Sequence, residues 1–347
     1  MKINAAAVGC CLGLLLVAVG CSGDRSRPPS LKLQGSGASF PAPLYTRWFQ
    51  EFSKATPGVT IDYQAKGSGA GIKDFINQTV DFAASDAAMT AEEIAEVKDG
   101  VVLLPVTAGK VVLAYNLPGG PAELKLSREA YTKILMGEIT RWNDPLVVAC
   151  NDGFAMPDLP VTVVVRSDSS GTTYVFSMHL SAISESWEKT YGTNKTINWP
   201  ASDKFIKGPK NDGVTALIKQ TPGSIGYVEF GFASQTGQPM ATLENNAGKY
   251  VQPSLQSGQA ALASVAEMPS DLIVWLPDPA GDESYPIVTY TWLLCYERYA
   301  SPEKAAAMRD VVTYCLTQGQ AISGELGYIP LPADVAAAVQ QAVARIQ

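Results

Sequence analysis

Hydrophobic positions along the chain fall into two alternating patterns. Short runs of apolar and β-branched residues predict strands. Between them lie segments whose apolar residues recur three or four positions apart, which predicts helices with one buried face. Strands that alternate with helices are typical of an α/β fold with parallel strands. The predicted strands that bear on function are Leu31–Leu33, Val59–Tyr63, Val80–Ala84 and Val161–Val165.

Three connections between a predicted strand and the next helix carry serine and glycine. They place Ser39, Ser68 and Ser170 near the carboxyl ends of strands, where open α/β sheets bind their ligands. A helix N-terminus there offers unpaired N–H groups and the positive end of the helix dipole. Taken singly, each loop is typical of an ordinary turn that caps a helix. Taken together, the three loops predict a dehydrated cage for a small anion.

The segment Arg166–Thr173 has the highest density of anion-binding groups. It contains one guanidinium, three serine hydroxyls, two threonine hydroxyls and a glycine. Arg166 can offer a planar fork of N–H donors to an oxyanion, and Asp168 would hold the guanidinium in position. The alternative is a surface ion pair worth under ~1 kcal/mol. Because the arginine directly follows a strand and precedes a Ser-Gly-Thr sequence, we favour the site.

Asp86, which follows the predicted strand Val80–Ala84, is an unexpected residue beside an anion. A carboxylate repels an anion unless the ligand carries a proton that the carboxylate can accept. Phosphate has such a proton, whereas sulfate is fully ionised at neutral pH and would face an unpaired buried charge. The alternative is that Asp86 begins a turn.

Composition restricts the class of protein. The 347 residues suffice for two domains, and 46% hydrophobic with 17% charged residues describes a folded globular chain. The net charge of −7 and the lack of a Lys/Arg run argue against nucleic acid as a partner. An acidic protein still binds an anion, because nearby N–H donors outweigh a distant, screened net charge.

The sequence predicts no catalytic residue, no metal and no cofactor. The single histidine, His179, shares an apolar helix face with Phe176 and Leu180, so a packed core histidine is expected rather than the base of a Ser-His-Asp triad. No GxSxG, HExxH or P-loop motif and no Cys/His cluster is present. A hydrolase that uses Ser170 as its nucleophile is the more distant alternative.

The N-terminus is a predicted targeting segment. Lys2 precedes an apolar stretch, Ala5–Gly20, that is short for a membrane span. It ends at Cys21 in a sequence that resembles a bacterial lipoprotein cleavage box, with Ala18 where leucine is usual. We therefore expect a signal peptide over 1–20, lipidation of Cys21, a flexible tether over 21–30 and an extracytoplasmic location at the cell membrane or in the periplasm. An ordinary secretory signal is the alternative.

Three cysteines remain beyond this segment, at Cys150, Cys295 and Cys315. In an oxidising compartment they permit one disulfide and one free thiol. Cys295 lies in a hydrophobic run, for which a buried free thiol is the alternative.

These residues together resemble the substrate-binding protein of the phosphate-specific ABC transporter, over roughly Leu31–Ala344. The combination of matching segments is specific, whereas no single segment is. The segments are Gly35–Tyr45, Val80–Asp86, Arg166–Thr172, Asn211–Val214, Pro222–Val228 and Tyr285–Val288.

The resemblance implies a type II periplasmic binding protein, with two α/β domains, mixed and mostly parallel sheets, helices on both faces and a ligand cleft between the domains. The first domain would comprise 31–112 and 286–347, and the second 113–285. The strands Gly109–Tyr115 and Ile287–Leu294 would form the hinge.

The resemblance also implies the ligand and the partners. The protein would be a monomeric, non-enzymatic receptor that binds inorganic phosphate and delivers it to the permease subunits of an ABC importer. A receptor for sulfate or molybdate and a purely adhesive surface lipoprotein remain alternatives. The implied phosphate contacts are Ser39, the backbone N–H of Phe40, Ser68, Asp86, Arg166, Asp168, Ser170, Gly171 and Thr172.

Overall fold

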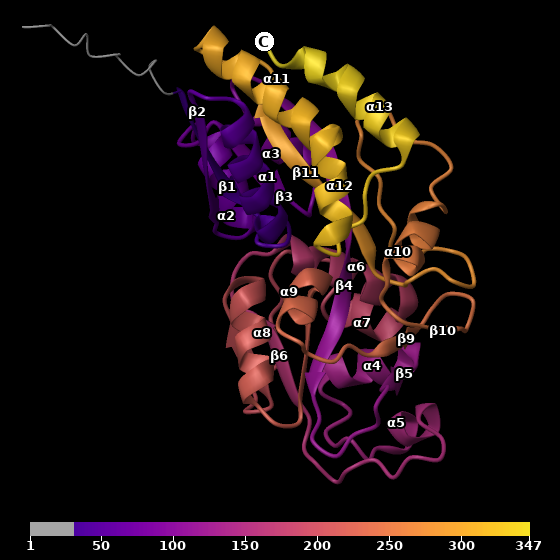
Figure 1. Ribbon diagram of the computed structural model, residues 1–347. Coiled ribbons are helices and arrows are strands. Elements are labelled where there is room, and N and C mark those ends of the chain that lie inside the picture. Colours follow the sequence, from indigo (N-terminus) through magenta and orange to yellow (C-terminus); the bar gives the residue numbers. More distant parts are fainter. Residues whose placement is uncertain (1–30) are drawn as a thin grey trace, which may run out of the picture.

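A computed structural model describes residues 31–347, and within them an eight-stranded mixed sheet runs through the length of the molecule (Figure 1). The strand order is β2-β1-β3-β11-β4-β8-β6-β7. A small separate sheet has the order β10-β9-β5. The strands are β1 (Leu31–Gly37), β2 (Val59–Ala65), β3 (Phe82–Ser85), β4 (Val101–Asn116), β5 (Lys125–Leu126), β6 (Thr162–Arg166), β7 (Phe205–Gly208), β8 (Ser224–Glu229), β9 (Thr242–Glu244), β10 (Tyr250–Val251) and β11 (Val288–Tyr296).

The long strand β4 connects two halves of this sheet. Its first part, Val101–Lys110, pairs antiparallel with β11, and its second part, Val111–Asn116, pairs antiparallel with β8. All of its residues except the last are buried, which explains its nearly uninterrupted hydrophobic sequence. We call the part built on β1, β2, β3, β11 and Val101–Lys110 the upper half, and the part built on β6, β7, β8 and Val111–Asn116 the lower half.

Helices cover both halves (Figure 1). Those of the upper half are α1 (Ala42–Ala55), α2 (Ser68–Ile76), α3 (Ala91–Ala95), α11 (Pro302–Leu316), α12 (Gln318–Glu325) and α13 (Ala333–Ala342), followed by a 3-10 turn at Val343–Arg345. Those of the lower half are α4 (Arg128–Met136), α5 (Pro145–Cys150), α6 (Gly171–Ile183), α7 (Glu185–Thr190), α8 (Lys210–Gln220) and α9 (Phe230–Gln235). The helix α10 (Leu255–Leu262) packs beside β11.

Parallel strands within each half direct their connections to one place. In the upper half β1 is parallel to β2 and β3, and in the lower half β6 is parallel to β7 and β8. The predicted α/β class is therefore confirmed. The first strand is longer than the predicted Leu31–Leu33, because Gly35–Gly37 also belongs to β1 and is paired with strands on both sides. A Cβ at Gly35 would come within 2.2 Å of the Phe82 ring, so this glycine allows close packing within the sheet.

The remaining sequence-based expectations concern the N-terminal targeting segment, membrane spans and the cysteines. The predicted signal peptide, Cys21 and the tether lie outside the described residues. Between residues 31 and 347, no helix has the length and apolar character that crossing a membrane requires. Cys150, Cys295 and Cys315 are all free thiols, which decides against the disulfide alternative.

A buried pair of opposite charges lies where β4 exchanges its partners. Lys110 Nζ donates to Gly327 O at 3.0 Å and lies 4.2 Å from the centroid of the Phe230 ring. Glu229 Oε2 accepts from Gly231 N at 2.8 Å, while Oε1 has no protein partner among the described residues. Burial raises the pKa of Glu229 and lowers the pKa of Lys110, and the opposite charge of each partner counteracts the shift. The two charges therefore depend on each other.

Replacing Lys110→Met should lower the free energy of unfolding by roughly 1–3 kcal/mol, because the Gly327 carbonyl loses its donor and Glu229 must stay protonated to remain buried. Adding Glu229→Gln to Lys110→Met should recover most of the lost free energy of unfolding, as measured by urea unfolding. Lys133→Met, which removes an exposed partner of Glu129, is the control and should change stability by under ~0.5 kcal/mol. Equal destabilisation in the single and double variants would contradict the pairing.

Candidate anion-binding site between the two halves

The structure brings the three predicted serine loops together where the halves meet. Ser39 and Ser68 of the upper half and Ser170 of the lower half are each at most 3% exposed. Backbone contact closes the junction, because Gly69 N donates to Ser169 O at 3.1 Å. The loops lie far apart in sequence and adjacent in space, as the convergence of strand ends predicted.

Two helix N-termini point their first turns into this junction. Ser170 is the N-cap of α6, and its Oγ accepts from Thr173 N at 3.0 Å. The N–H groups of Gly171 and Thr172 in the first turn have no partner within the helix, because four such groups are left at every helix start. The helix α2 begins at Ser68, so that residue is helical and not part of the preceding loop. Both helices add the positive end of their dipoles.

Phe40 is fixed beside these helix starts. Its side chain is fully buried, and its carbonyl oxygen accepts from Tyr328 Oη at 2.7 Å. The contact ties the first loop to the segment that follows α12. The backbone of Phe40, which the resemblance assigned to the ligand, is therefore held in one orientation.

Glycines allow the two halves to approach closely. A Cβ at Gly171 would lie 2.5 Å from Ser68 Oγ and 2.7 Å from Asp86 Oδ2. A Cβ at Gly69 would lie 2.1 Å from Ser169 Oγ. Real Cβ atoms do not occur at such distances, so larger residues at either position would hold the halves apart. The role of these glycines is thus close approach across the junction.

Arg166 is a buried donor with one nitrogen left over. Its Nε donates to Asp168 Oδ1 at 2.8 Å and its Nη2 to Asp168 Oδ2 at 2.6 Å. Nη1 is buried and has no partner in the part of the chain that the structure describes. The arginine side chain is 1% exposed, so the surface-pair alternative is wrong. Partial burial by itself raises the pKa of Asp168, but hydrogen bonds and charge from Arg166 outweigh it and lower that pKa. The pair remains ionised, and Nη1 is available to an anion.

Asp86 faces the same space from the upper half. It is 1% exposed, and its Oδ1 accepts from Thr291 Oγ1 at 2.9 Å. Its Oδ2 is the atom directed toward Gly171. Burial raises the pKa of Asp86 to about 7, although the Thr291 hydrogen bond and the charge of Arg166 oppose the shift. One carboxylate oxygen is therefore held by the protein and the other lies beside the anion donors.

The sequence reading missed two residues that complete the arrangement. Thr291, on β11, holds Asp86 across 205 positions of sequence, and nothing in its local sequence indicates this. Asn211 lies in a segment that carried the family resemblance, but it received no role. Its side chain donates to Ser39 Oγ at 3.0 Å and to Thr172 Oγ1 at 3.3 Å.

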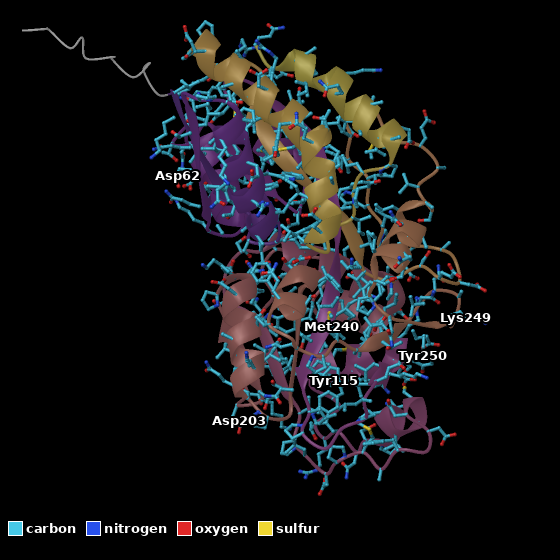
Figure 2. All side chains as sticks on the ribbon, in the orientation of Figure 1. Asp62, Tyr115, Asp203, Met240, Lys249 and Tyr250 are labelled. Carbon is cyan, nitrogen blue, oxygen red and sulfur yellow. The ribbon has the colours of Figure 1, made fainter. Side chains whose placement is uncertain are left out.

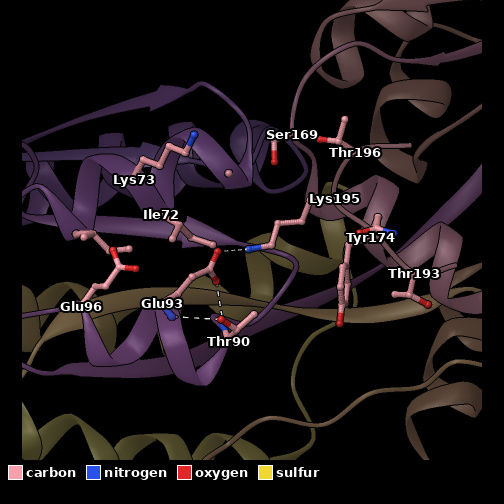
Figure 3. A pocket seen from close by; sticks show the side chains of 13 residues that line it. Ile72, Lys73, Thr90, Glu93, Glu96, Ser169, Tyr174, Thr193, Lys195 and Thr196 are labelled. Atoms are coloured by element: carbon pink, nitrogen blue, oxygen red, sulfur yellow. Dashed lines mark hydrogen bonds and ion pairs between the residues drawn. The ribbon is translucent and has the colours of Figure 1, made fainter. Parts of the chain in front are cut away.

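An open pocket lies at the edge of the junction (Figure 3). Gly69 and Ser169, which meet across the two halves, line part of its wall. Lys195 Nζ of the lower half contacts Glu93 Oε1 of the upper half at 2.7 Å, with side chains 17% and 28% exposed. Glu93 also forms a capping box with Thr90 at the start of α3. An ion pair thus bridges the two halves beside the cage.

His179, the single histidine of the sequence, lies in the core of the lower half. His179 is buried, with Nε2 2.8 Å from Tyr131 Oη and Nδ1 2.7 Å from Pro277 O. Burial lowers its pKa to about 4. The predicted core histidine is confirmed, and both ring nitrogens are occupied by other groups. Residues 31–347 contain no group of three or more His, Cys, Asp or Glu side chains placed to hold a metal ion.

Comparisons with known proteins agree with this topology. A family model described as a PBP superfamily domain matches residues 22–318. A solved high-affinity periplasmic phosphate-binding protein, bound with phosphate, superimposes with a TM-score of 0.74 at 22% identity, covering 90% of this chain and 93% of that one. A phosphate-binding protein from Stenotrophomonas maltophilia gives a TM-score of 0.71 at 20% identity, covering 90% and 94%. The class of fold is that of the type II periplasmic binding proteins, as the sequence indicated.

Sequence relatives define the family more narrowly. The phosphate-binding protein PstS of Pasteurella multocida is 38% identical over 310 residues, covering 89% of this chain and 88% of the relative. The protein of the same name from Methanocaldococcus jannaschii is 35% identical over 364 residues, covering 96% and 93%. The chain belongs to the PstS family, the substrate-binding proteins of phosphate ABC transporters, within the PBP superfamily.

The raised pKa of Asp86 predicts how the stability of the unliganded protein depends on pH. A carboxyl that titrates near 7 when folded and near 3.8 when unfolded stabilises the fold below pH 4 and loses that contribution as pH rises toward 7. The loss is about 1.4 kcal/mol per pH unit crossed. Urea unfolding at pH 4, 6 and 8 should show Asp86→Asn gaining stability relative to the parent as pH rises. A difference that stays constant across this range would disprove the shift.

Proposed function

We propose that this chain is an extracytoplasmic receptor that binds one dehydrated inorganic phosphate between its halves and delivers it to an ABC importer. The observation that carries the proposal is the meeting of unpaired donors and one acceptor in a buried space. Arg166 Nη1 is a buried donor that has no partner within residues 31–347, and the helix starts at Ser68 and Ser170 meet at the same junction, beside Asp86. Phosphate presents oxygens to such donors and a hydroxyl to Asp86.

Asp86 gives this cage a means of selecting the ligand. An ionised Asp86 accepts the phosphate proton through Oδ2, since Thr291 occupies Oδ1. Sulfate brings no proton at neutral pH, so two negative charges would meet in a space without water. The pKa of Asp86 lies at about 7, so below neutral pH Asp86 becomes protonated. It can then donate a hydrogen bond to sulfate, which carries no proton of its own. The preference for phosphate over sulfate should therefore narrow below neutral pH.

Delivery requires the cage to open, and the strand exchange offers a hinge. We propose that 31–112 with 286–347 moves as one domain and 113–285 as the other, about the crossovers near Val112 and Pro286. The Glu93–Lys195 contact at 2.7 Å supports a closed state, because the two side chains come from opposite halves.

The proposal also includes a monomer tethered by lipid at Cys21 and transfer of phosphate to the permease subunits. We infer binding without hydrolysis, since Ser170 Oγ is engaged as the N-cap of α6, where it accepts from Thr173 N.

Thermal unfolding with phosphate and sulfate in parallel tests the function. Phosphate at millimolar concentration should raise the midpoint by several degrees at pH 8, because a ligand bound only by the folded state stabilises it by mass action. Sulfate should hardly change the unfolding midpoint of the parent. It should raise the midpoint of Asp86→Asn more, because that variant no longer presents a buried negative charge to the anion. Asp62→Asn, on the outer edge of the upper half (Figure 2) and 48% exposed, is the control.

Each other outcome selects an alternative. A larger shift with sulfate or molybdate than with phosphate would indicate a receptor for that anion. No shift with any of them would support an adhesive role, and release of a chromogenic alcohol from a phosphate ester would indicate a hydrolase. Phosphate selectivity that is unchanged in Asp86→Asn would remove Asp86 from the explanation.

Arg166→Ala should weaken phosphate binding by roughly 2–5 kcal/mol, the cost of removing one partner of a buried, hydrogen-bonded charge pair. Titration calorimetry would show this as an affinity loss of about 30-fold or more. Arg141→Ala removes a surface arginine that pairs with Asp158 in the lower half and is 47% exposed, so its affinity should match the parent. A loss below about 0.5 kcal/mol in Arg166→Ala would place the guanidinium outside the site.

A further inference from the structure

Asn211 is a buried amide that contacts both sides of the cage. It is fully buried in the first turn of α8, in the lower half. Its Nδ2 donates to Ser39 Oγ of the upper half at 3.0 Å and to Thr172 Oγ1 of the lower half at 3.3 Å. Its backbone N–H also donates to Ser39 Oγ, at 3.2 Å. Its Oδ1 accepts from Glu229 N at 3.0 Å.

The Glu229 contact fixes which way the amide points. A backbone N–H can only donate, so the atom that faces Glu229 N must be the amide oxygen. The NH₂ group is then necessarily the end that faces the two hydroxyls. Asn211 therefore presents donors, and not an acceptor, to Ser39 and Thr172.

These contacts determine what the two hydroxyls can still do. A hydroxyl oxygen has two lone pairs and one hydrogen. Ser39 Oγ receives two hydrogen bonds, both from Asn211, so its lone pairs are used and only its hydrogen remains. Thr172 Oγ1 receives one from the same amide. In residues 31–347 both hydroxyl hydrogens are left to donate into the cage.

The backbone is strained at the residue before Asn211, which indicates that the surrounding contacts require this orientation of Asn211. Lys210 has a φ of 58°, in the left-handed region that a residue with a side chain rarely adopts. This conformation points Lys210 N toward Asp168 Oδ1, at 2.9 Å, and the next N–H toward Ser39. One strained residue thus places two successive N–H groups, one behind the Arg166 pair and one on a hydroxyl of the opposite half. Such strain persists only where surrounding contacts enforce it.

We propose that Asn211 is a positioning residue that makes Ser39 an obligate hydrogen-bond donor and occupies one lone pair of Thr172, and so leaves Asp86 as the acceptor for a ligand proton. The inference rests on the proposed function and goes beyond it, because it names a residue that sets the direction in which the Ser39 hydroxyl bonds. A ligand that must donate a second proton near Ser39 finds no acceptor there. The site thereby takes a tetrahedral oxyanion that directs a single hydroxyl toward Asp86.

Two replacements of similar size separate this role from a purely structural one. Asn211→Asp keeps the acceptor for Glu229 N but turns the donating end into an acceptor, so the Ser39 and Thr172 hydrogens should turn toward it and away from the ligand. Phosphate affinity at pH 8 should fall at least 100-fold. Asn211→Leu removes both functions and should lose at least tenfold. Thr215→Val is the control, since Thr215 Oγ1 donates to the Asn211 carbonyl one turn along α8 without touching the hydroxyls of the cage.

A double-mutant cycle with Ser39→Ala identifies the coupling. If Asn211 acts through the Ser39 hydroxyl, Asn211→Leu should cost less than threefold in the Ser39→Ala background. Calorimetry gives the affinities, and urea unfolding without phosphate gives the stability of each variant. A structural role alone would lower stability and leave the loss of affinity the same in both backgrounds, which would overturn the proposal.

The remaining outcomes are also decisive. If the parent shows no phosphate-dependent shift, the proposed function and this inference fall together. If the parent binds phosphate and the Asn211→Asp affinity stays within threefold, the inference alone is wrong. If neither Asn211 variant folds, Ser39→Ala by itself decides, because an affinity unchanged from the parent would show that the oriented hydroxyl does not serve the ligand.

Discussion

The Asp86 carboxylate and the Arg166 guanidinium are almost fully buried, and their burial governs the architecture of the cage around them. Asp86 and Arg166 are 1% and 5% exposed, so each charge needs a partner within the protein or from the ligand. Asp168 supplies part of what Arg166 needs, and Thr291 supplies part of what Asp86 needs. What remains is one guanidinium nitrogen and one carboxylate oxygen, a donor and an acceptor that a protonated oxyanion can satisfy together.

The exclusion of water from the cage also explains why the two halves must meet so closely. A gap wide enough for water would screen the Asp86 charge and weaken its discrimination against fully ionised anions. Contact between Gly171 and Asp86, and between Gly69 and Ser169, leaves no space for a methyl group. The Glu93–Lys195 ion pair lies nearer the solvent and contributes little to stability by itself. Exclusion of water therefore depends mainly on backbone packed against side chains.

The sequence predicted those parts of the site whose signal is local. Ser39, Ser68 and Asp86 each follow a strand and Arg166 is the last residue of one, so their positions at the junction could be inferred from neighbouring residues. The residues that orient them could not, because Asn211 is 172 positions from Ser39 and Thr291 is 205 from Asp86. Gly35 and Ser68 were read as loop because glycine and serine favour turns. In the fold, sheet pairing on both sides and an early helix start override that preference.

The cage and the strand exchange share a residue, which gives closure a route to the ligand. The Glu229 side chain lies buried beside Lys110, where β4 leaves β11 for β8, and its backbone N–H fixes the amide of Asn211. A rotation of the halves at Lys110 would change the surroundings of Glu229 and so the orientation that Asn211 imposes on Ser39. Because Ser39 and Asn211 belong to opposite halves, the hinge motion that we propose would break both of their hydrogen bonds on opening. In that proposal, closure around a phosphate would again occupy both lone pairs of Ser39 Oγ and leave its hydrogen to the ligand.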